Sequence, residues 1–217
     1  MPTQQTRQAA GIRSGNAIII GGSIAGLLAA RVLADHFERV TLIERDPFLA
    51  DIQTRKGVPQ GRHVHGLLAR GLEIMTTLFP GLENELVTGG AVAGDIAGDT
   101  RWYHFGGYKF QFASGFVGLL MSRPLLEWHI RRRVLALPNV AMLPECAVDH
   151  LLASADRARV TGVALRRRAS GADLEQLSAD LVVDASGRGS QSPAWLSALG
   201  YDKPAETTIT IGVGYTT

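Results

Sequence analysis

Apolar residues in this chain fall into short continuous runs, which alternate with longer stretches where apolar positions recur every three or four residues. The first two runs are Ala17–Ile20 and Val40–Ile43, and the stretch between them has helical spacing. A short uninterrupted run is typical of a strand that is buried on both faces, as in a parallel sheet. The opening pattern therefore predicts a strand, a helix and a second, parallel strand.

A glycine-rich turn joins this first strand to the helix, and the second strand ends on an acid, Glu44. The turn reads GGSIAG, and its small residues are Gly21, Gly22, Ser23, Ala25 and Gly26. This order is typical of a βαβ unit that binds a dinucleotide, with helix amides facing the pyrophosphate and the acid accepting hydrogen bonds from a ribose. Because Ser23 departs from the GxGxxG pattern, a strand–helix turn that binds nothing is the alternative.

The remaining pattern predicts further helices and strands along the chain. Helices are expected at about 65–78, 82–87, 122–137 and 193–199, and strands at 140–143, 147–153, 160–166, 174–177, 179–183 and 207–215. Ser122 is expected to cap its helix, with Pro124 in the first turn. The three short strands from 147 to 177 are separated by polar turns and predict an antiparallel meander.

Residues 91–121 alternate and are rich in glycine and aromatic residues, which predicts strands and turns. The aromatic residues are Trp102, Tyr103, Phe105, Tyr108, Phe110, Phe112 and Phe116. We interpret them as core residues, with the lining of an apolar substrate cavity as the alternative.

Composition and charge narrow the class of protein. The chain has 217 residues, enough for one large domain or two small ones, and 46% are hydrophobic, which indicates a globular protein. A net charge of +2 is too small to indicate nucleic-acid binding, and we interpret Arg131–Arg133 as a solvated helix face. The single cysteine, Cys146, excludes an internal disulfide and fits a reducing compartment.

Neither a secretion signal nor a membrane span is predicted. The first fifteen residues are polar, and the longest uncharged stretch, Ser14–Ala30, is too short to cross a bilayer. We therefore expect a cytoplasmic protein with no transmembrane segment and no nucleic-acid partner.

A second motif, LVVDASGRGS, begins at Leu181 and places Asp184 at the end of an apolar strand. The small residues of the Ser-Gly-Arg-Gly segment that follows would let the backbone pass close to a ligand, while Asp184 would contact the polar groups of that ligand. Alone, this motif fits an ordinary strand-to-loop turn equally well. Its place after a helix, a parallel strand and a meander disfavours an NAD-dependent dehydrogenase.

Four segments make the chain similar to the single-component FAD-dependent hydroxylases, whose reference fold is that of p-hydroxybenzoate hydroxylase. They are GGSIAGLLAARVLADHFERVTLIERD, RKGVPQGRHVHGLL, SRPLLEWHIRRRVLALPNV and LVVDASGRGSQSPAWLSALGY. Within that superfamily the chain most resembles flavin epoxidases and hydroxylases of polyketide and polyether pathways. The resemblance implies an α/β fold, with a Rossmann-like FAD-binding domain, a three-stranded antiparallel meander and the start of a substrate-side sheet.

The resemblance also implies a domain division. It places a tail at 1–15, the FAD-binding domain at 16–205 with part of the substrate region inserted at about 85–121, and the first strand of an incomplete substrate domain at 206–217. The family's third fingerprint, a Gly-Asp segment, is expected well beyond LVVDASG. We therefore expect an N-terminal half that associates with itself or with a complementary C-terminal chain through an edge strand near 207–215.

The activity that the resemblance implies is that of an FAD-dependent monooxygenase. Such an enzyme uses NAD(P)H and O2 to epoxidise or hydroxylate an apolar small molecule of secondary metabolism through a C4a-hydroperoxyflavin. The alternatives are an isoprenoid reductase or a halogenase on the same fold, or a non-catalytic nucleotide-binding module. The N-terminal half is expected to hold the ADP moiety while binding FAD weakly. The sequence identifies no catalytic acid, base or nucleophile.

Matching motif positions imply which residues bind FAD. The glycine turn holds the pyrophosphate, Glu44 with Arg45 holds the adenosine end, and the backbone at Ala147–Val148 lies beside the adenine.

Further positions imply contacts elsewhere on the cofactor. Arg55 and Arg123 are expected to contact its phosphates or ribose, because arginine is always charged and can donate two hydrogen bonds to one phosphate. Asp184 and Gly187 belong to the second acidic fingerprint, which supports FAD.

The pair His63 and His65 alternates along the chain, so in an extended segment both side chains face one way and could ligate a metal. Neither a carboxylate nor a cysteine cluster accompanies them, and we expect no metal. A place near the flavin, or in capping the following helix, is the expected role.

Overall fold

The structure is a computed structural model that describes residues 14–47, 49–168 and 173–214. The described chain divides into two compact units. The first contains residues 14–47, 134–168 and 173–203, and the second contains residues 49–133 and 204–214. Each has its own sheet, and the α/β class predicted from the sequence is confirmed. The predicted tail at 1–15 lies almost wholly outside the described residues.

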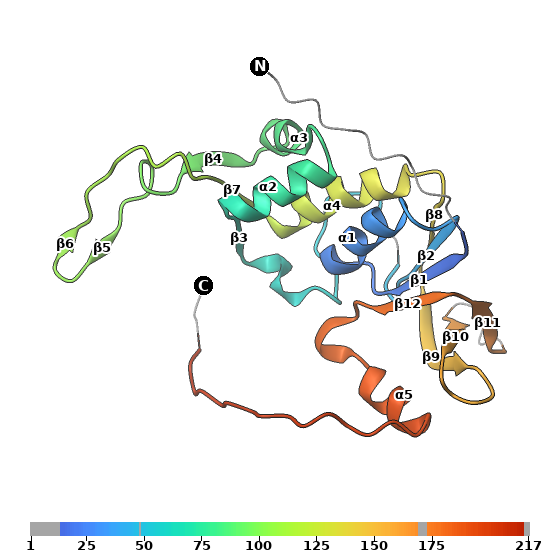
Figure 1. Cartoon of the computed structure of the whole chain (residues 1–217). Coiled ribbons are helices and arrows are strands. Elements are labelled where there is room, and N and C mark those ends of the chain that lie inside the picture. The colour runs from blue at the N-terminus through green and yellow to red at the C-terminus, as the bar shows by residue number, and fades with distance from the viewer. Residues whose placement is uncertain (1–13, 48, 169–172, 215–217) are drawn as a thin grey trace, which may run out of the picture. The chain divides into compact units, whose positions relative to one another are not determined.

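The first unit is built on a parallel sheet with the strand order β12-β1-β2-β8 (Figure 1). Its strands are β1 (Asn16–Ile20), β2 (Arg39–Ile43), β8 (Val140–Leu143) and β12 (Leu181–Asp184). The central strand β1 pairs with its neighbour in sequence, β2, and with the distant β12. The three parallel pairings confirm the predicted arrangement.

Both faces of β1 are buried, which explains its continuous apolar sequence. Ile18 and Ile20 belong to one core cluster with Val163. Ile19 faces the other way, toward Gly26 of helix α1 (Ile24–Leu33), where a Cβ would lie 3.4 Å from its side chain. Successive side chains of a strand point to opposite faces, so one sheet separates the helix from the second core layer.

That second layer is the predicted antiparallel meander. It consists of β9 (Cys146–Ala153), β10 (Val160–Arg167) and β11 (Glu175–Ser178), with β10 in the middle. Val163 and Leu165 of β10 are fully buried and pack in the core with the parallel sheet. Helix α5 (Ser192–Ala198) adds Trp195 at the edge of the same core.

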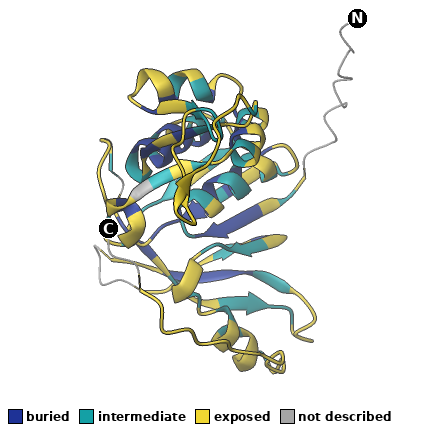
Figure 2. Cartoon of the chain, turned by 90° about the vertical axis from the view of Figure 1, so that its left-hand side faces the viewer, coloured by how far each residue is buried: buried dark blue, intermediate teal, exposed yellow. Residues whose placement is uncertain are grey.

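The second unit combines helices with a small antiparallel sheet of order β3-β7-β4. The helices are α2 (Ala69–Leu78), α3 (Leu82–Thr88) and α4 (Arg123–Leu135). The last two residues of α4 belong to the first unit. A short 3-10 helix, η1 (Pro59–Arg62), precedes β3. The strands are β3 (Val64–Leu67), β4 (Val92–Asp95) and β7 (Val117–Ser122). Leu82, Leu86, Leu119 and Ile130 are fully buried within this unit, and Figure 2 shows how burial varies along the chain.

Two helix boundaries differ from the prediction. His65 was expected to begin a helix, but it lies in β3 opposite Met121 of β7, and the helix begins at Ala69. The helical spacing after residue 65 does not reveal a strand partner more than fifty residues away. At α4, the Ser122 hydroxyl accepts a hydrogen bond from the Leu125 amide at 3.3 Å, as a helix cap does, and the helix ends at Leu135.

The interpretation of the aromatic residues at 102–116 as core is wrong. Residues 96–116, here called the aromatic arm, carry the two-residue strands β5 (Tyr103–His104) and β6 (Gly107–Tyr108), which pair with each other. Figure 1 shows the arm extending beyond β4 and β7. All seven aromatic residues are exposed, and Phe105 is 96% exposed. Among the described strands β5 and β6 pair only with each other, and their side chains are exposed to solvent.

Asp95 holds the base of the aromatic arm. Its carboxylate accepts hydrogen bonds from the amides of Ala97, Gly98, Ser114 and Gly115 and from the Ser114 hydroxyl, at 2.7 to 2.9 Å. The hydrogen bond from the Ser114 hydroxyl and those from the backbone amides hold the pKa of Asp95 well below its ordinary value. The two ends of the arm are therefore joined at one side chain.

The predicted strand Thr207–Tyr215 is also wrong over its described part. Residues 207–214 form neither helix nor strand, and the apolar side chains Ile209, Ile211 and Val213 are exposed. A strand needs a partner for its backbone groups, and none of the described strands pairs with this segment. Tyr215 lies outside the described residues. Within the described chain, no helix has the length and apolar character needed to cross a membrane.

Candidate functional site

The turn after β1 requires glycine at two positions for separate reasons. Gly21 has a φ of +103°, in the left-handed region, and a Cβ there would lie 2.7 Å from the Ala185 carbonyl oxygen. At Gly26 a Cβ would lie 1.8 Å from the Gly21 carbonyl oxygen. Gly21 therefore allows a tight exit from the strand, and Gly26 allows the helix to begin close against the turn.

Glu44 is buried at the end of β2 and faces this turn. Its Oε2 accepts a hydrogen bond from the Gly22 amide at 2.9 Å, and its Oε1 accepts one from the Asp46 amide at 2.9 Å. A carboxylate at the end of this strand is the group expected to accept hydrogen bonds from a ribose. That contact stays a prediction.

Helix α1 begins at this turn with chemistry that suits an anion. Ser23 is its N-cap residue, and Ala25 in the first turn is exposed. Throughout α1, which is fully described, the only charged residue is Arg31, in the last turn. The first-turn amides therefore give a positive field at the helix start that no acidic side chain of the helix opposes.

Asp184 organises the loop that follows β12. Its carboxylate accepts hydrogen bonds from the hydroxyls of Ser186, Ser190 and Ser192, each at 2.5 Å, and from the Ser186 amide at 2.9 Å. Burial raises the pKa of Asp184, but the serine hydrogen bonds outweigh it and leave the pKa below its ordinary value. Ser190 and Ser192 were not predicted as site residues.

The two sequence motifs meet at the carboxyl edge of the parallel sheet. Ile20 pairs with both Ile43 and Asp184, and the Gly21 amide donates to the Ile43 carbonyl oxygen at 2.8 Å. The structure therefore brings Gly21, Glu44 and Asp184 to one edge, where ligands of open α/β sheets bind.

The other predicted residues of this unit have different surroundings. Arg45 is exposed, and its Nη1 would lie 3.9 Å from a Cβ at Gly189. Gly187 has a φ of +73° and open space around it. Val148 lies in β9 opposite Leu165, with its side chain against the core. The predicted contacts of these residues with FAD stay predictions.

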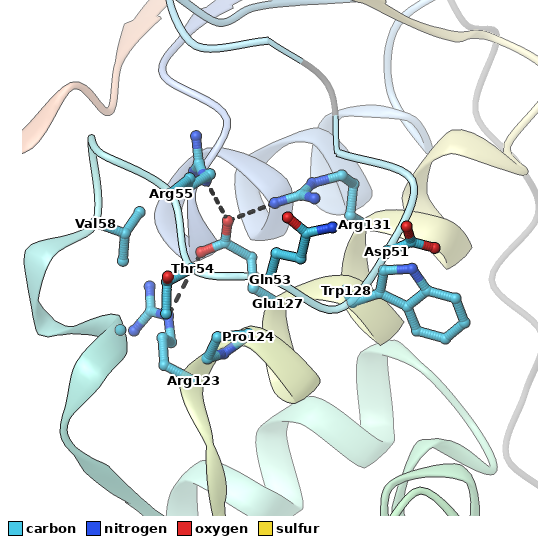
Figure 3. A pocket seen from close by; sticks show the side chains of 11 residues that line it. Asp51, Gln53, Thr54, Arg55, Val58, Arg123, Pro124, Glu127, Trp128 and Arg131 are labelled. Carbon is cyan, nitrogen blue, oxygen red and sulfur yellow. Dashed lines mark hydrogen bonds and ion pairs between the residues drawn. The ribbon is translucent and has the colours of Figure 1, made fainter.

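Arg55 and Arg123, predicted to contact FAD, both bind Glu127 of α4 in the second unit (Figure 3). Glu127 accepts hydrogen bonds from Arg55 Nε at 2.7 Å, Arg131 Nη2 at 2.5 Å and Arg123 Nε at 3.5 Å. The side chains of Arg55, Glu127 and Arg131 are at most 8% exposed. We call these four residues the Glu127 cluster.

Sequence reasoning missed half of this cluster. Arg131 is buried, so the interpretation of Arg131–Arg133 as a solvated face is wrong for this residue, and Arg133 binds Glu85 at 2.7 Å. The available signal was the spacing of Arg123, Glu127 and Arg131, which repeats every four residues and places all three on one helix face.

Beside the cluster, the loop before β3 lines an open cavity of about 350 Å³. Its lining residues are Thr54, Arg55, Lys56, Val58, Pro59 and Arg62. Three of these carry positive charge and none is acidic, so the cavity suits an anion. Arg55 belongs both to this lining and to the Glu127 cluster.

The histidine pair shows a local contact. His65 Nδ1 lies 2.9 Å from the His63 carbonyl oxygen. Capping of the following helix by His65 is wrong, because Leu68 is the N-cap residue of α2. In the part of the chain that the structure describes, no three histidine, cysteine or acidic residues are grouped as metal ligands would be.

Comparison with known proteins gives one sequence relative. The protein Rv3254 of Mycobacterium tuberculosis is 42% identical over 207 residues, which is 92% of this chain and 44% of that protein. The chain thus spans less than half the length of this curated relative. No protein-family model matches the chain.

Solved structures show what the fold is. One similar structure is PqsL of Pseudomonas aeruginosa, which is described as a probable FAD-dependent monooxygenase. The match covers 90% of this chain and 48% of the PqsL chain, with a TM-score of 0.64 and 20% sequence identity. Another is the myxobacterial chondrochloren halogenase CndH, which is described as FAD-dependent. The match covers 82% of this chain and 38% of the CndH chain, with a TM-score of 0.62 and 23% sequence identity. The chain has the fold of FAD-binding monooxygenases.

Proposed function

We propose that this chain is the dinucleotide-binding part of an FAD-dependent oxidoreductase, and that the whole protein is a monooxygenase. The observation that carries the proposal is the meeting of the glycine turn, Glu44 and the Asp184 loop at one edge of a sheet with this fold. The residues fit FAD, because the turn offers amides and a glycine backbone while Glu44 offers an acceptor for a ribose.

In this proposal the glycine turn holds the pyrophosphate, and Glu44 with Arg45 holds the adenosine end beside the backbone of Val148. Asp184 fixes the loop that contains Gly187, and Arg55 and Arg123 supply donors to phosphate or ribose. Bound FAD would supply the redox chemistry that links NAD(P)H to O2. The protein positions the cofactor and an apolar small-molecule substrate, which is hydroxylated or epoxidised.

The polyketide-pathway epoxidases remain the proposed closest group of enzymes, supported by the RKGVPQGRHVHGLL and LVVDASGRGS segments. A halogenase is the second candidate, and the likeness to CndH supports it. The mass of the product distinguishes the two, because a monooxygenase adds one oxygen atom and a halogenase adds a halogen. This measurement is made with a full-length protein related to Rv3254.

Titration of the purified chain with FAD and with ADP tests the proposal. We expect both to bind, and we expect Glu44→Gln to weaken each by on the order of tenfold, because one charged acceptor of the ribose is lost. Glu38→Gln is the matched control, since Glu38 is exposed just before β2. Failure of the wild-type chain to bind either nucleotide would refute the proposed function.

A further inference from the structure

The aromatic arm, residues 96–116, exposes a large apolar surface. Its seven aromatic side chains are between 51% and 96% exposed. An aromatic side chain loses about 150–250 Å² of accessible surface when it is buried, so the arm leaves on the order of 900 Å² of aromatic surface uncovered. The largest apolar patch on a typical monomer is about 300–600 Å², and larger patches mark sites of interaction. The arm is therefore a candidate interaction surface.

The tip of the arm departs from the chemistry that its turn favours. Tyr103 pairs with Tyr108 and His104 with Gly107, so Phe105 and Gly106 form a two-residue hairpin loop. Both loop residues have a positive φ, +53° and +83°. Such a loop favours asparagine, aspartate or glycine at its first position, and phenylalanine is strained there. The most exposed aromatic side chain of the arm thus stands where a polar residue would suit the backbone better.

Behind the tip, aromatic rings are followed by cations (Figure 1 shows β5 and β6 at the end of the arm). The rings of Tyr103 and Tyr108 pack edge to face, with their centroids 5.2 Å apart. Lys109 Nζ lies 5.7 Å from the centroid of the Trp102 ring, and the Arg101 guanidinium carbon lies 5.5 Å from that of Tyr108. Because a strand rises about 3.3 Å per residue, the two cations lie roughly 13 Å behind the tip.

The acidic group of the arm lies at its base. Asp99 is the one acid among residues 96–116, all of which the structure describes, and its carboxylate accepts a hydrogen bond from the Asp95 amide at 2.7 Å. The distal part, residues 100–110, contains Arg101 and Lys109 and no acid. This part of the arm therefore favours a negatively charged partner.

Aromatic rings and cations occur on both faces of the hairpin. Since side chains alternate along a strand, Arg101 and Tyr103 lie on one face, and Trp102 and Lys109 lie on the other. A folded protein that covered one face of this narrow ribbon would leave the other in water, whereas a lipid surface surrounds whatever enters it. Tyrosine and tryptophan collect at the level of lipid headgroups, and cations bind anionic lipids. These observations favour a lipid surface over a protein partner.

We propose that the aromatic arm binds the surface of a bilayer that contains anionic lipids. Phe105 enters the outer part of the acyl chains, the rings behind it lie among the headgroups, and Arg101 and Lys109 contact anionic groups. Because β5 and β6 pair with each other, the backbone groups between them bring their own hydrogen-bond partners to this depth. The proposal is independent of the FAD site.

Co-sedimentation of the purified chain with vesicles tests the proposal, using phosphatidylcholine alone and equal parts of phosphatidylcholine and phosphatidylserine. We expect binding to the mixed vesicles that added salt weakens, and much weaker binding to phosphatidylcholine alone. Phe105→Asn creates the Asn-Gly loop that the turn favours, so the hairpin stays folded, and binding should weaken by on the order of tenfold. Combining Arg101→Gln with Lys109→Gln should weaken binding to the mixed vesicles by on the order of tenfold.

Two matched controls and a second readout place the contact on the arm. Ile209→Asn removes an apolar side chain that is 83% exposed outside the arm, and Arg159→Gln removes an exposed cation of the first unit. Neither should change vesicle binding. Brominated acyl chains should quench tryptophan fluorescence in the wild type, and Trp102→Phe should remove most of this quenching.

Three results would overturn the proposal. The first is equal vesicle binding by the wild type and Phe105→Asn, or an equal loss in Ile209→Asn. The second is a dimer in analytical ultracentrifugation that Phe105→Asn makes monomeric, without vesicle binding, because the arm would then bind a second copy of the chain. The third is resistance of the arm to chymotrypsin in a full-length protein related to Rv3254 without vesicles, because the rest of that protein would then cover the arm.

Discussion

At Gly26, one methyl group decides whether helix α1 can begin where it does. A Cβ at this residue would overlap the Gly21 carbonyl oxygen, which belongs to rigid backbone. We expect Gly26→Ala to lower the free energy of unfolding by about 1–3 kcal/mol, because either the turn or the helix must shift. Urea denaturation measures this. Gly107→Ala is the control, since a Cβ there meets nothing within 4 Å, and an equal loss in both variants would contradict the steric explanation.

Asp184 makes stability depend on pH in a defined direction. Its folded-state pKa lies below the unfolded value of about 3.9, so its contribution is present above that pH and is lost as the pH falls through the folded value. We expect Asp184→Asn to be less stable than the wild type at neutral pH, with a difference that shrinks below about pH 4.

Chemical denaturation between pH 3 and pH 7 tests this. Asp202→Asn, at an exposed position, should track the wild type throughout. A difference between Asp184→Asn and the wild type that stays constant with pH would show that the serine hydrogen bonds do not favour the ionised carboxylate.

The residues that the sequence could predict are those whose role is local. Gly21, Gly26 and Glu44 belong to one continuous motif, so their geometry follows from a few neighbouring residues. The role of Glu127 depends on its contact with Arg55, which is distant along the chain. A single sequence does not show which loop residue will lie against which face of a helix. Ser190 and Ser192 gain their role only because the loop after β12 folds back on Asp184.

At the scale of elements, helix α4 takes part in two networks of ion pairs. Glu127 of α4 binds three arginines, while Glu85 of α3 binds His129 and Arg133 of α4. The hydrogen bond from Arg133 keeps the pKa of Glu85 below its ordinary value, although its partial burial acts in the opposite direction. Ion pairs therefore accompany the buried apolar residues Leu125, Leu126, Ile130 and Val134 in this arginine-rich helix.

The aromatic arm is predicted to depend on Asp95. We expect Asp95→Ala to speed cleavage by chymotrypsin within residues 102–116, because the five hydrogen bonds at the base are lost. Mass spectrometry of limited digests measures this, with Asp173→Ala, at an exposed position of the first unit, as the control. Equal cleavage rates in both variants would contradict the role of Asp95.

The elements that the sequence predicted well are those with strong local periodicity. The four parallel strands and the meander were found within about two residues, because continuous or alternating apolar runs encode their burial. The arm was misread since aromatic side chains indicate burial only where another layer exists to cover them. Strand β3 was missed because its four residues, including one glycine, are too few to show a period.

At the scale of the whole chain, the two compact units have separate buried clusters. Leu165 is fully buried in the first unit and Leu86 in the second. We expect Leu165→Ala and Leu86→Ala each to cost about 2–5 kcal/mol of stability, because each leaves a cavity. Hydrogen exchange should rise mainly in β1 and β9–β12 for the first variant and mainly in α2–α4 for the second.

Equal increases in both units for either variant would show that the two cores unfold as one. Leu68→Ala, at a position 66% exposed, is the control and should leave exchange in both units unchanged. The comparison needs no ligand and reports on cooperativity directly.

The pairing of β1 with β12 has a consequence for synthesis on the ribosome. The backbone groups on one edge of β1 can pair with β2 soon after synthesis. Those on the other edge pair with Leu181–Asp184, which is synthesised roughly 140 residues later. At about 5–20 residues per second, this interval lasts on the order of ten seconds or more. During that time a strand of sequence NAIII has one unpaired edge, which is a template for pairing with another chain.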